Sequence, residues 1–174
     1  MKRIDRAFLC ALLALAGSHA MALDTDSKQP MYIEADTATY DEGKGQTIYT
    51  GNVRFTQGSL ESLSDKMIVY QKDGKTDKIE TFGNPTRVRQ TPEPGKPPWN
   101  GLGQRAEFFP DTSILVLHEK AMAWQGDKPE SSDRVTSERI EYDSQKSVMK
   151  AGLPSSRGDR VHVTIQPEKD GAGQ

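Results

Sequence analysis

The chain of 174 residues is long enough for one domain with a hydrophobic core, and one domain is the expectation for this length. Its 23 lysines and arginines face 25 aspartates and glutamates, so the net charge of −2 favours neither nucleic acid nor an anionic surface as a partner. The single cysteine, Cys10, rules out an intramolecular disulfide, and the three histidines are too few for a multi-histidine metal site.

The first 22 residues predict a signal peptide that is cleaved during export. Basic residues precede an apolar run over 7–16, which is too short to span a bilayer but suits a signal-peptide core. Ala20-Met21-Ala22 supplies the small-x-small pattern of signal peptidase, so we expect cleavage before Leu23, with cleavage after Ala20 as the second choice. A buried N-terminal helix is the alternative, but the basic flank and the polar stretch that follows favour export. We therefore expect a periplasmic protein.

After a polar segment at 23–29, which we expect to be flexible, alternating apolar and polar residues predict a series of short strands. The first half of the chain is expected to contain strands at 31–36, 38–41, 47–50, 52–57, 60–63, 65–70, 78–82 and 86–90. Turn residues separate these strands at intervals of about ten residues, a spacing typical of all-β proteins. Within 47–58, Gly51-Asn52 predicts a tight turn and therefore a hairpin.

Residues 91–103 interrupt this pattern with four prolines and three glycines, so we expect a long loop, with Trp99 as a packing anchor. The second half then repeats the first at an offset of about seventy residues. Residues 121–126 match 53–58. This alignment places Ala121 and Ala123 at the inward positions of Val53 and Phe55, so we expect Met122 and Trp124 to face outward. In this alignment Glu119-Lys120 occupies the position of the predicted Gly-Asn turn.

No segment after the signal peptide has the apolar stripe of a helix, and 167–174 is expected to be a disordered tail. The strands therefore predict an antiparallel sheet wound into a sandwich, barrel or jelly roll. Their apolar phase predicts an interior lined by Met31, Ile33, Ile48, Val53, Phe55, Ile68, Tyr70, Val88, Phe108, Ile140, Tyr142, Val161 and Val163. An ordinary core and a lipid-binding groove would both show this pattern.

The first and last strands, at 31–36 and 161–165, are expected to be open edges of the sheet. Neither contains the Lys or Pro that commonly blocks pairing, so we expect one molecule to stack on the next. The expected edge residues are Met31, Tyr32, Ile33, Glu34, Val161, His162, Val163, Thr164 and Ile165.

No pattern of catalytic residues stands out: a Gly-x-Ser-x-Gly elbow, a phosphate loop and a dinucleotide fingerprint are all missing. The acidic residues that could supply a glycosidase pair are Glu61, Asp65, Glu107, Glu138 and Glu141. They fall mainly on the polar phase of the strands, where a solvated face accounts for them. We therefore expect no enzyme, catalytic residue, metal or cofactor, with a periplasmic glycan hydrolase and a structural β-module with a filled core as alternatives.

Three motifs follow the signal peptide in order: PMYIEAD at 30–36, YTGNVRFTQG at 49–58 and SDKMIVY at 64–70. Together they resemble the OstA-like family of lipopolysaccharide-transport proteins, with the domain at 30–166. The resemblance implies an open, twisted β-jellyroll whose apolar interior holds the acyl chains of lipid A. Two features depart from the family pattern in local loop geometry, the Pro-rich segment 91–103 and Glu119-Lys120.

The resemblance also implies the partners of the chain. Members of the family stack head-to-tail into a bridge from the inner to the outer membrane. The bridge would connect a membrane-anchored OstA-like subunit of the inner-membrane complex with an outer-membrane lipopolysaccharide-assembly protein. A cleavable signal without a retained anchor matches the free bridging component.

Overall fold

The computed structural model describes residues 26, 28–91, 95–153 and 160–167. The predicted signal peptide at 1–22 and the chain from 168 onward lie outside these residues, as does most of the segment at 23–29. Within the described ranges, no helix is long and apolar enough to cross a membrane.

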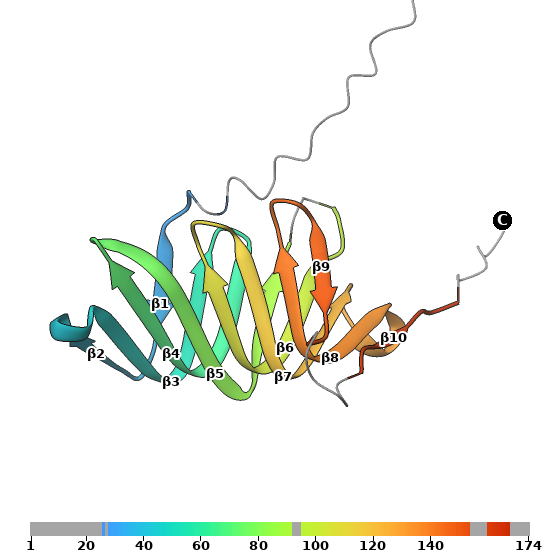
Figure 1. Cartoon of the computed structure of the whole chain (residues 1–174), viewed down its shortest axis with the longest axis horizontal. Helices are drawn as coiled ribbons and strands as arrows, with labels where there is room; N and C mark the ends of the chain where they lie inside the picture. Colours follow the sequence, from blue (N-terminus) through green and yellow to red (C-terminus); the bar gives the residue numbers. More distant parts are fainter. Residues whose placement is uncertain (1–25, 27, 92–94, 154–159, 168–174) are drawn as a thin grey trace, which may run out of the picture.

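The described residues form one antiparallel sheet and two short 3₁₀ turns, which confirms the prediction of an all-β fold. The strands are β1 (Met31–Glu34), β2 (Thr37–Asp41), β3 (Gln46–Gln57), β4 (Leu60–Lys72), β5 (Lys75–Gln90), β6 (Trp99–Phe109), β7 (Ile114–Gln125), β8 (Arg134–Asp143), β9 (Val148–Ala151) and β10 (His162–Thr164). The 3₁₀ turns are η1 (Glu42–Lys44) and η2 (Pro129–Ser131). The strand order is β1-β3-β4-β5-β6-β7-β8-β10, with β2 added to β3 and β9 added to β8. The sheet does not close, since β1 and β2 lie at one end and β9 and β10 at the other (Figure 1).

A line of register shifts crosses the sheet and folds it into two layers. Every neighbouring pair from β3–β4 to β7–β8 changes register near its middle. Such bulges bend a strand and increase its twist, so each long strand contributes one half to each layer. The first layer contains β1, β10 and residues 53–57, 60–64, 86–90, 99–103, 121–125 and 134–137, and the second contains β2, β9 and residues 46–50, 66–72, 75–82, 105–109, 114–118 and 139–143. The result is the open, twisted jellyroll that the family resemblance implied, among the sandwich, barrel and jelly roll that the strand pattern left open.

The predicted hairpin within 47–58 is wrong, because the chain does not reverse at Gly51-Asn52. β3 runs through both residues, whose φ angles are 84° and 46°, at the register shift between Thr50 and Val53. Residues that tolerate positive φ suit a bulge as well as a turn, so this dipeptide alone does not separate the two. The reversal comes at Gly58-Ser59, between β3 and β4.

β7 bends at the place equivalent to the bulge of β3. Glu119-Lys120 also has positive φ, 62° and 55°, although neither residue is glycine or asparagine. Beyond this dipeptide Ala121 and Ala123 are each only 1% exposed, while Met122 and Trp124 lie half-buried on the opposite face. The predicted alignment of the two halves is therefore confirmed at this position.

The Pro/Gly-rich loop is shorter than the predicted 91–103, because β6 begins at Trp99. Gly103 continues this strand as a buried residue rather than breaking it. A Cβ atom on Gly103 would lie 2.8 Å from the carbonyl oxygen of His118 in β7. Glycine is thus used here for the close approach of two backbones, which the sequence pattern does not distinguish from a loop.

The predicted facing of β4 is reversed in its second half. Met67 and Val69 are buried in the core, whereas Ile68 and Tyr70 lie on the outer face. The register shift earlier in β4 changes the phase of the alternation, and four successive apolar or aromatic residues conceal that change in the sequence. Ile48, the partner of Ile68 in β3, likewise stays outside the core, contrary to the prediction.

Both ends of the sheet are open edges, as predicted, but the last strand is shorter than expected. β10 covers only His162–Thr164 instead of 161–165. Val161 and Val163, predicted to line the interior, are 43% and 60% exposed. This prediction is wrong because β10 pairs with the start of β8, at the margin of the first layer, and no further strand of the described residues covers it.

Charged side chains form a network on the outer face of the second layer. Glu107 lies at its centre: Arg105 Nη1 donates to Oε1 at 2.6 Å, and His118 Nε2 lies 2.8 Å from Oε2. Further pairs join Lys78 and Arg105 to Glu80, and Arg139 and Lys150 to Glu141. The network therefore consists of two groups of ion pairs, one across β5, β6 and β7 and the other across β8 and β9.

The network also covers apolar surface and changes the acidity of its members. Val116, whose register partners are Glu107 and Glu141, is only 3% exposed although it lies on this outer face. Tyr70 Oη donates to Glu80 Oε2 at 2.6 Å, and this hydrogen bond raises the pKa of Tyr70 to about 12. Burial opposes ionisation of Glu107, but the hydrogen bond from His118 and the charge and hydrogen bond of Arg105 outweigh it and hold the pKa of Glu107 below its usual value.

We expect Gly103→Ala to lower the free energy of unfolding by about 1–3 kcal/mol, because the new methyl group meets backbone that has little room to move. Gly43→Ala is the matched control, since its Cβ would meet only Asp41 Oδ1 at 3.5 Å. Urea denaturation measures both. Equal stability of the two variants would contradict the assigned packing of β6 against β7.

We expect Glu107→Gln to lower the free energy of unfolding near neutral pH by about 1–3 kcal/mol, because a charge-assisted pairing is lost. A carboxyl whose pKa is lowered by folding stabilises the protein above its unfolded-state pKa, and this contribution disappears as the pH falls through the folded-state pKa. The difference between wild type and variant should therefore shrink as the pH is lowered from about 6 to about 3. Glu34→Gln, at an exposed position of β1, serves as the control. A difference that is independent of pH would refute this role of Glu107.

Candidate functional site

The apolar core of the protein lies between the two layers. Every long strand from β3 to β8 contributes to it. Its buried members are Val53, Phe55, Leu60, Met67, Val69, Ile79, Val88, Trp99, Ala106, Leu115, Leu117, Ala121, Ala123 and Ile140. The set mixes large and small side chains and forms one apolar cluster that extends from β3 to β8.

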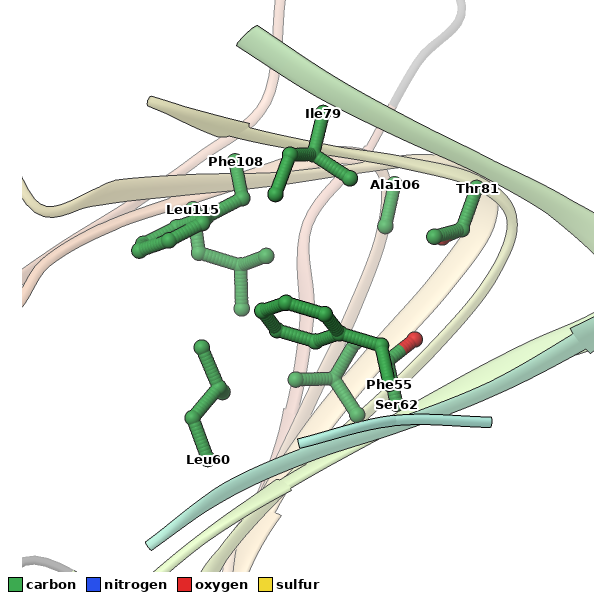
Figure 2. Close-up of a pocket in the computed structure, with 9 residues that line it drawn as sticks. Phe55, Leu60, Ser62, Ile79, Thr81, Ala106, Phe108 and Leu115 are labelled. Atoms are coloured by element: carbon green, nitrogen blue, oxygen red, sulfur yellow. The ribbon is translucent and has the colours of Figure 1, made fainter. Parts of the chain in front are cut away.

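A small hollow within this core separates side chains of the two layers (Figure 2). Phe55 and Leu60 of the first layer face Ile79, Phe108 and Leu115 of the second. The cavity volume is about 20 Å³, little more than a single water molecule needs. Packed side chains therefore fill the interior in this conformation.

A second hollow opens between the strand ends that lie farthest from the line of register shifts; we call it the slot. It is lined by Asp26, Gln57, Leu60, Gln90, Phe108, Ser113, Leu115, Tyr142 and Ser144. Tyr142 also stacks on Trp99, with ring centroids 5.1 Å apart and planes 14° apart, so an aromatic pair joins the two layers and Trp99 is the packing anchor that was predicted. The slot thus combines an apolar floor with polar groups at its rim.

Apart from Asp26 at the slot, the polar residues that line the two hollows are neutral. Thr81 and Thr86 share a hydrogen bond of 3.0 Å between their hydroxyls, and Thr86 also donates to the carbonyl oxygen of Leu63 at 3.2 Å. Burial raises the pKa of the Tyr142 phenol above its usual value, which disfavours a negative charge at this position. The inner hollow therefore suits an apolar ligand, and the charged group at the slot is the carboxylate of Asp26.

Most residues predicted to line the interior lie in it or against it. Val53, Phe55, Val88 and Ile140 are buried in the core, and Met31, Ile33, Phe108 and Tyr142 pack against it. Ile48, Ile68, Tyr70, Val161 and Val163 do not belong to it. Contact of the first eight residues with a lipid remains a prediction.

Sequence reasoning missed several core residues. Leu115 and Leu117 of β7 alternate within an unbroken apolar run and are buried, although no strand was predicted at 114–117. Met67 and Val69 were missed because the predicted alternation in β4 placed Ile68 and Tyr70 in the interior instead. A period-two count around 114–118 could have identified β7, whereas only the position of the bulge reveals the facing of β4.

Three of the five acidic residues considered for catalysis are engaged in ion pairs on the outer face. Glu61 pairs with Arg54 at 2.8 Å, and Glu107 and Glu141 belong to the charged network described above. None of these three lines the slot or the inner hollow. Among the described residues, no group of three or more His, Cys, Asp or Glu side chains could hold a metal ion.

Comparison with known proteins agrees with this architecture. A family described as "LptA/(LptD N-terminal domain) LPS transport protein" matches residues 32–148. The chain is 30% identical to the lipopolysaccharide export system protein LptH of Pseudomonas aeruginosa over 90% of each chain. It is 31% identical to the lipopolysaccharide export system protein LptA of Haemophilus influenzae, over 95% of this chain and 96% of the relative.

A solved structure gives the same result at the level of the fold. The crystal structure of LptH from Pseudomonas aeruginosa, described as the LptA-homologous periplasmic component of the lipopolysaccharide transport device, superposes with a TM-score of 0.73. The match covers 82% of this chain and 99% of the LptH chain, at 27% sequence identity. Sequence family, relatives and fold therefore agree, and the chain belongs to the LptA/(LptD N-terminal domain) family of lipopolysaccharide-transport proteins.

Proposed function

We propose that the protein is a periplasmic carrier that binds lipopolysaccharide through the acyl chains of lipid A and stacks head-to-tail into a bridge between the two membranes. The observation that carries this proposal is the uncharged interior that runs along an unclosed sheet. Exposure of acyl chains to water costs about 0.8 kcal/mol per methylene group, so a continuous apolar path would lower the barrier to crossing an aqueous compartment. This is a non-enzymatic role.

Lipid entry requires the two layers to move apart, because the interior is already filled by side chains. Two features favour such a movement. The layers are connected along one side by the line of register shifts, and the slot lies on the other. The single cysteine of the chain leaves no intramolecular disulfide to hold them together.

Exposed apolar side chains at the edges support stacking. Large exposed hydrophobic side chains are concentrated at the two ends of the sheet, with Leu63 as the exception. They are Tyr32 and Tyr40 at the β1–β2 end, and Val148, Met149, Leu153, Val161, Val163 and Ile165 at the β9–β10 end. Unpaired strand edges beside apolar side chains favour pairing with another chain, and joining opposite ends would propagate rather than close.

The same edges would accept the proposed partners in the membranes. A membrane-anchored OstA-like subunit of the inner-membrane complex would pair with one end of the stack, and an outer-membrane lipopolysaccharide-assembly protein with the other. Both would extend the sheet by the same strand addition, which needs only free backbone groups and a matching apolar interior.

We expect a photo-crosslinking residue at Phe55 or Phe108 to capture lipopolysaccharide, because both side chains border the inner hollow. Ile48 and Ile68 are matched controls, since they are aliphatic residues of the same sheet on its outer face. Crosslinked adducts can be detected by mobility shift and mass spectrometry. Equal capture at the inner and outer positions would refute the interior as the binding site and leave the β-module with a filled core.

We expect deletion from Val161 to the C-terminus to leave a folded protein that binds lipopolysaccharide but no longer forms concentration-dependent oligomers, because one edge strand and its apolar residues are removed. Deletion from Glu168 onward is the control, since it leaves β10 in place. Analytical ultracentrifugation over a range of concentrations compares both with the chain that begins at Leu23. Oligomers of the same size in all three proteins would argue against stacking through this edge.

A further inference from the structure

The carboxylate of Asp26 lies at the slot in a cradle of hydrogen-bond donors. The backbone N–H of Ser59 donates to Oδ1 at 3.0 Å, and the Ser59 hydroxyl donates to Oδ2 at 2.5 Å. Gln90 Nε2 donates to the same Oδ2 at 3.1 Å. Three donors from the β3–β4 turn and the end of β5 therefore converge on one anion; we call Ser59 and Gln90 the cradle.

The β3–β4 turn, which carries Ser59, leaves room for the Asp26 carboxylate only because residue 58 is glycine. Gly58 has a φ of 58°, and a Cβ atom on it would collide with Asp26 Oδ1. Gln90 is only 9% exposed with Asp26 in place, and removal of the anion would take away the acceptor that its amide Nε2 contacts. The geometry thus favours an acceptor group with negative charge at this position.

The residues after Asp26 extend the cover over the slot. The backbone carbonyl of Asp26 accepts from Gln29 N at 3.0 Å, and the carbonyl of Gln29 accepts from Gln57 Nε2 at 3.2 Å. Both Asp26 and Gln57 line the slot together with the apolar Leu60 and Tyr142. These contacts are hydrogen bonds between polar groups at the rim, so they can be exchanged for contacts with a polar head group without loss of apolar packing.

We propose that the cradle is an anion subsite for a phosphate group on the polar head of an acylated ligand, and that Asp26 occupies it as a displaceable stand-in. A phosphate offers the same charged oxygen acceptors as a carboxylate and matches N–H and O–H donors at a tight turn. A head group held there lies beside the apolar floor of the slot, so its acyl chains would enter between the layers. This inference rests on the proposed function, because it assigns the head-group position of the same ligand.

The test compares variants of the chain from Leu23 onward, with lipid A that carries phosphates and with the same lipid after removal of its phosphates. Asp26→Ala frees the cradle and should bind phosphorylated lipid A roughly tenfold more tightly, the factor that corresponds to one charge-assisted hydrogen bond. Its affinity for the dephosphorylated lipid should stay unchanged. Asp77→Ala, at an exposed position of β5, removes the same charge elsewhere and should change neither affinity.

Ser59→Ala combined with Asp26→Ala should remove most of the gain, because the hydroxyl donor to the phosphate is lost. The amide resonance of Ser59 gives a readout at the cradle itself: it should shift on mutation of Asp26 alone, and again when phosphorylated lipid A is added. Circular dichroism confirms that the variants are folded.

The outcomes separate this inference from the proposed function. Failure of every protein, wild type included, to bind either lipid would overturn the proposed function and this inference with it. Binding by all variants with no effect of Asp26→Ala, or an equal gain for both lipids, would overturn the anion subsite alone. A shift of the Ser59 amide by inorganic phosphate at the concentration of lipid that saturates the protein would assign the cradle to free phosphate and refute the head-group role.

Discussion

The line of register shifts is the constraint on which the rest of the structure depends. A ten-stranded sheet without it would be a twisted ribbon with one wide apolar face open to water. Because neighbouring strands shift register at the same level, their bends add up, and one sheet forms both walls of the interior. The core, the slot and the open edges are all consequences of this fold line.

The two faces of the second layer differ in composition and in what they contribute to the fold. The inner face carries aliphatic and aromatic side chains and holds the layers together by burial. The outer face carries the charged network, whose long side chains cover Val116 while their charged ends stay paired. The charges of these ion pairs thus lie on the outer face of the layer and away from the core.

The type of fold could be predicted from the sequence because period-two alternation and frequent turns are strong signals. The interior was predicted well wherever a strand keeps one phase, as at Val53 and Phe55, and poorly where a bulge changes the phase, as at Ile68. Bulges are hard to predict from the sequence. Gly51-Asn52 has the composition of a turn, and Glu119-Lys120 contains no residue type that favours positive φ. The cradle also could not be predicted, since Asp26 meets Gln90 only through the folded sheet.

The bulges of β3 and β7 show that the same bend occurs in both halves of the chain. Each added strand widens the sheet by about 4.8 Å and, if it carries this bend, continues both walls at once. The width of the interior is therefore set by where the strands bend, whereas its length is set by how many strands are present. A protein built in this way can grow along one axis, within a chain or from chain to chain, while its cross-section stays constant.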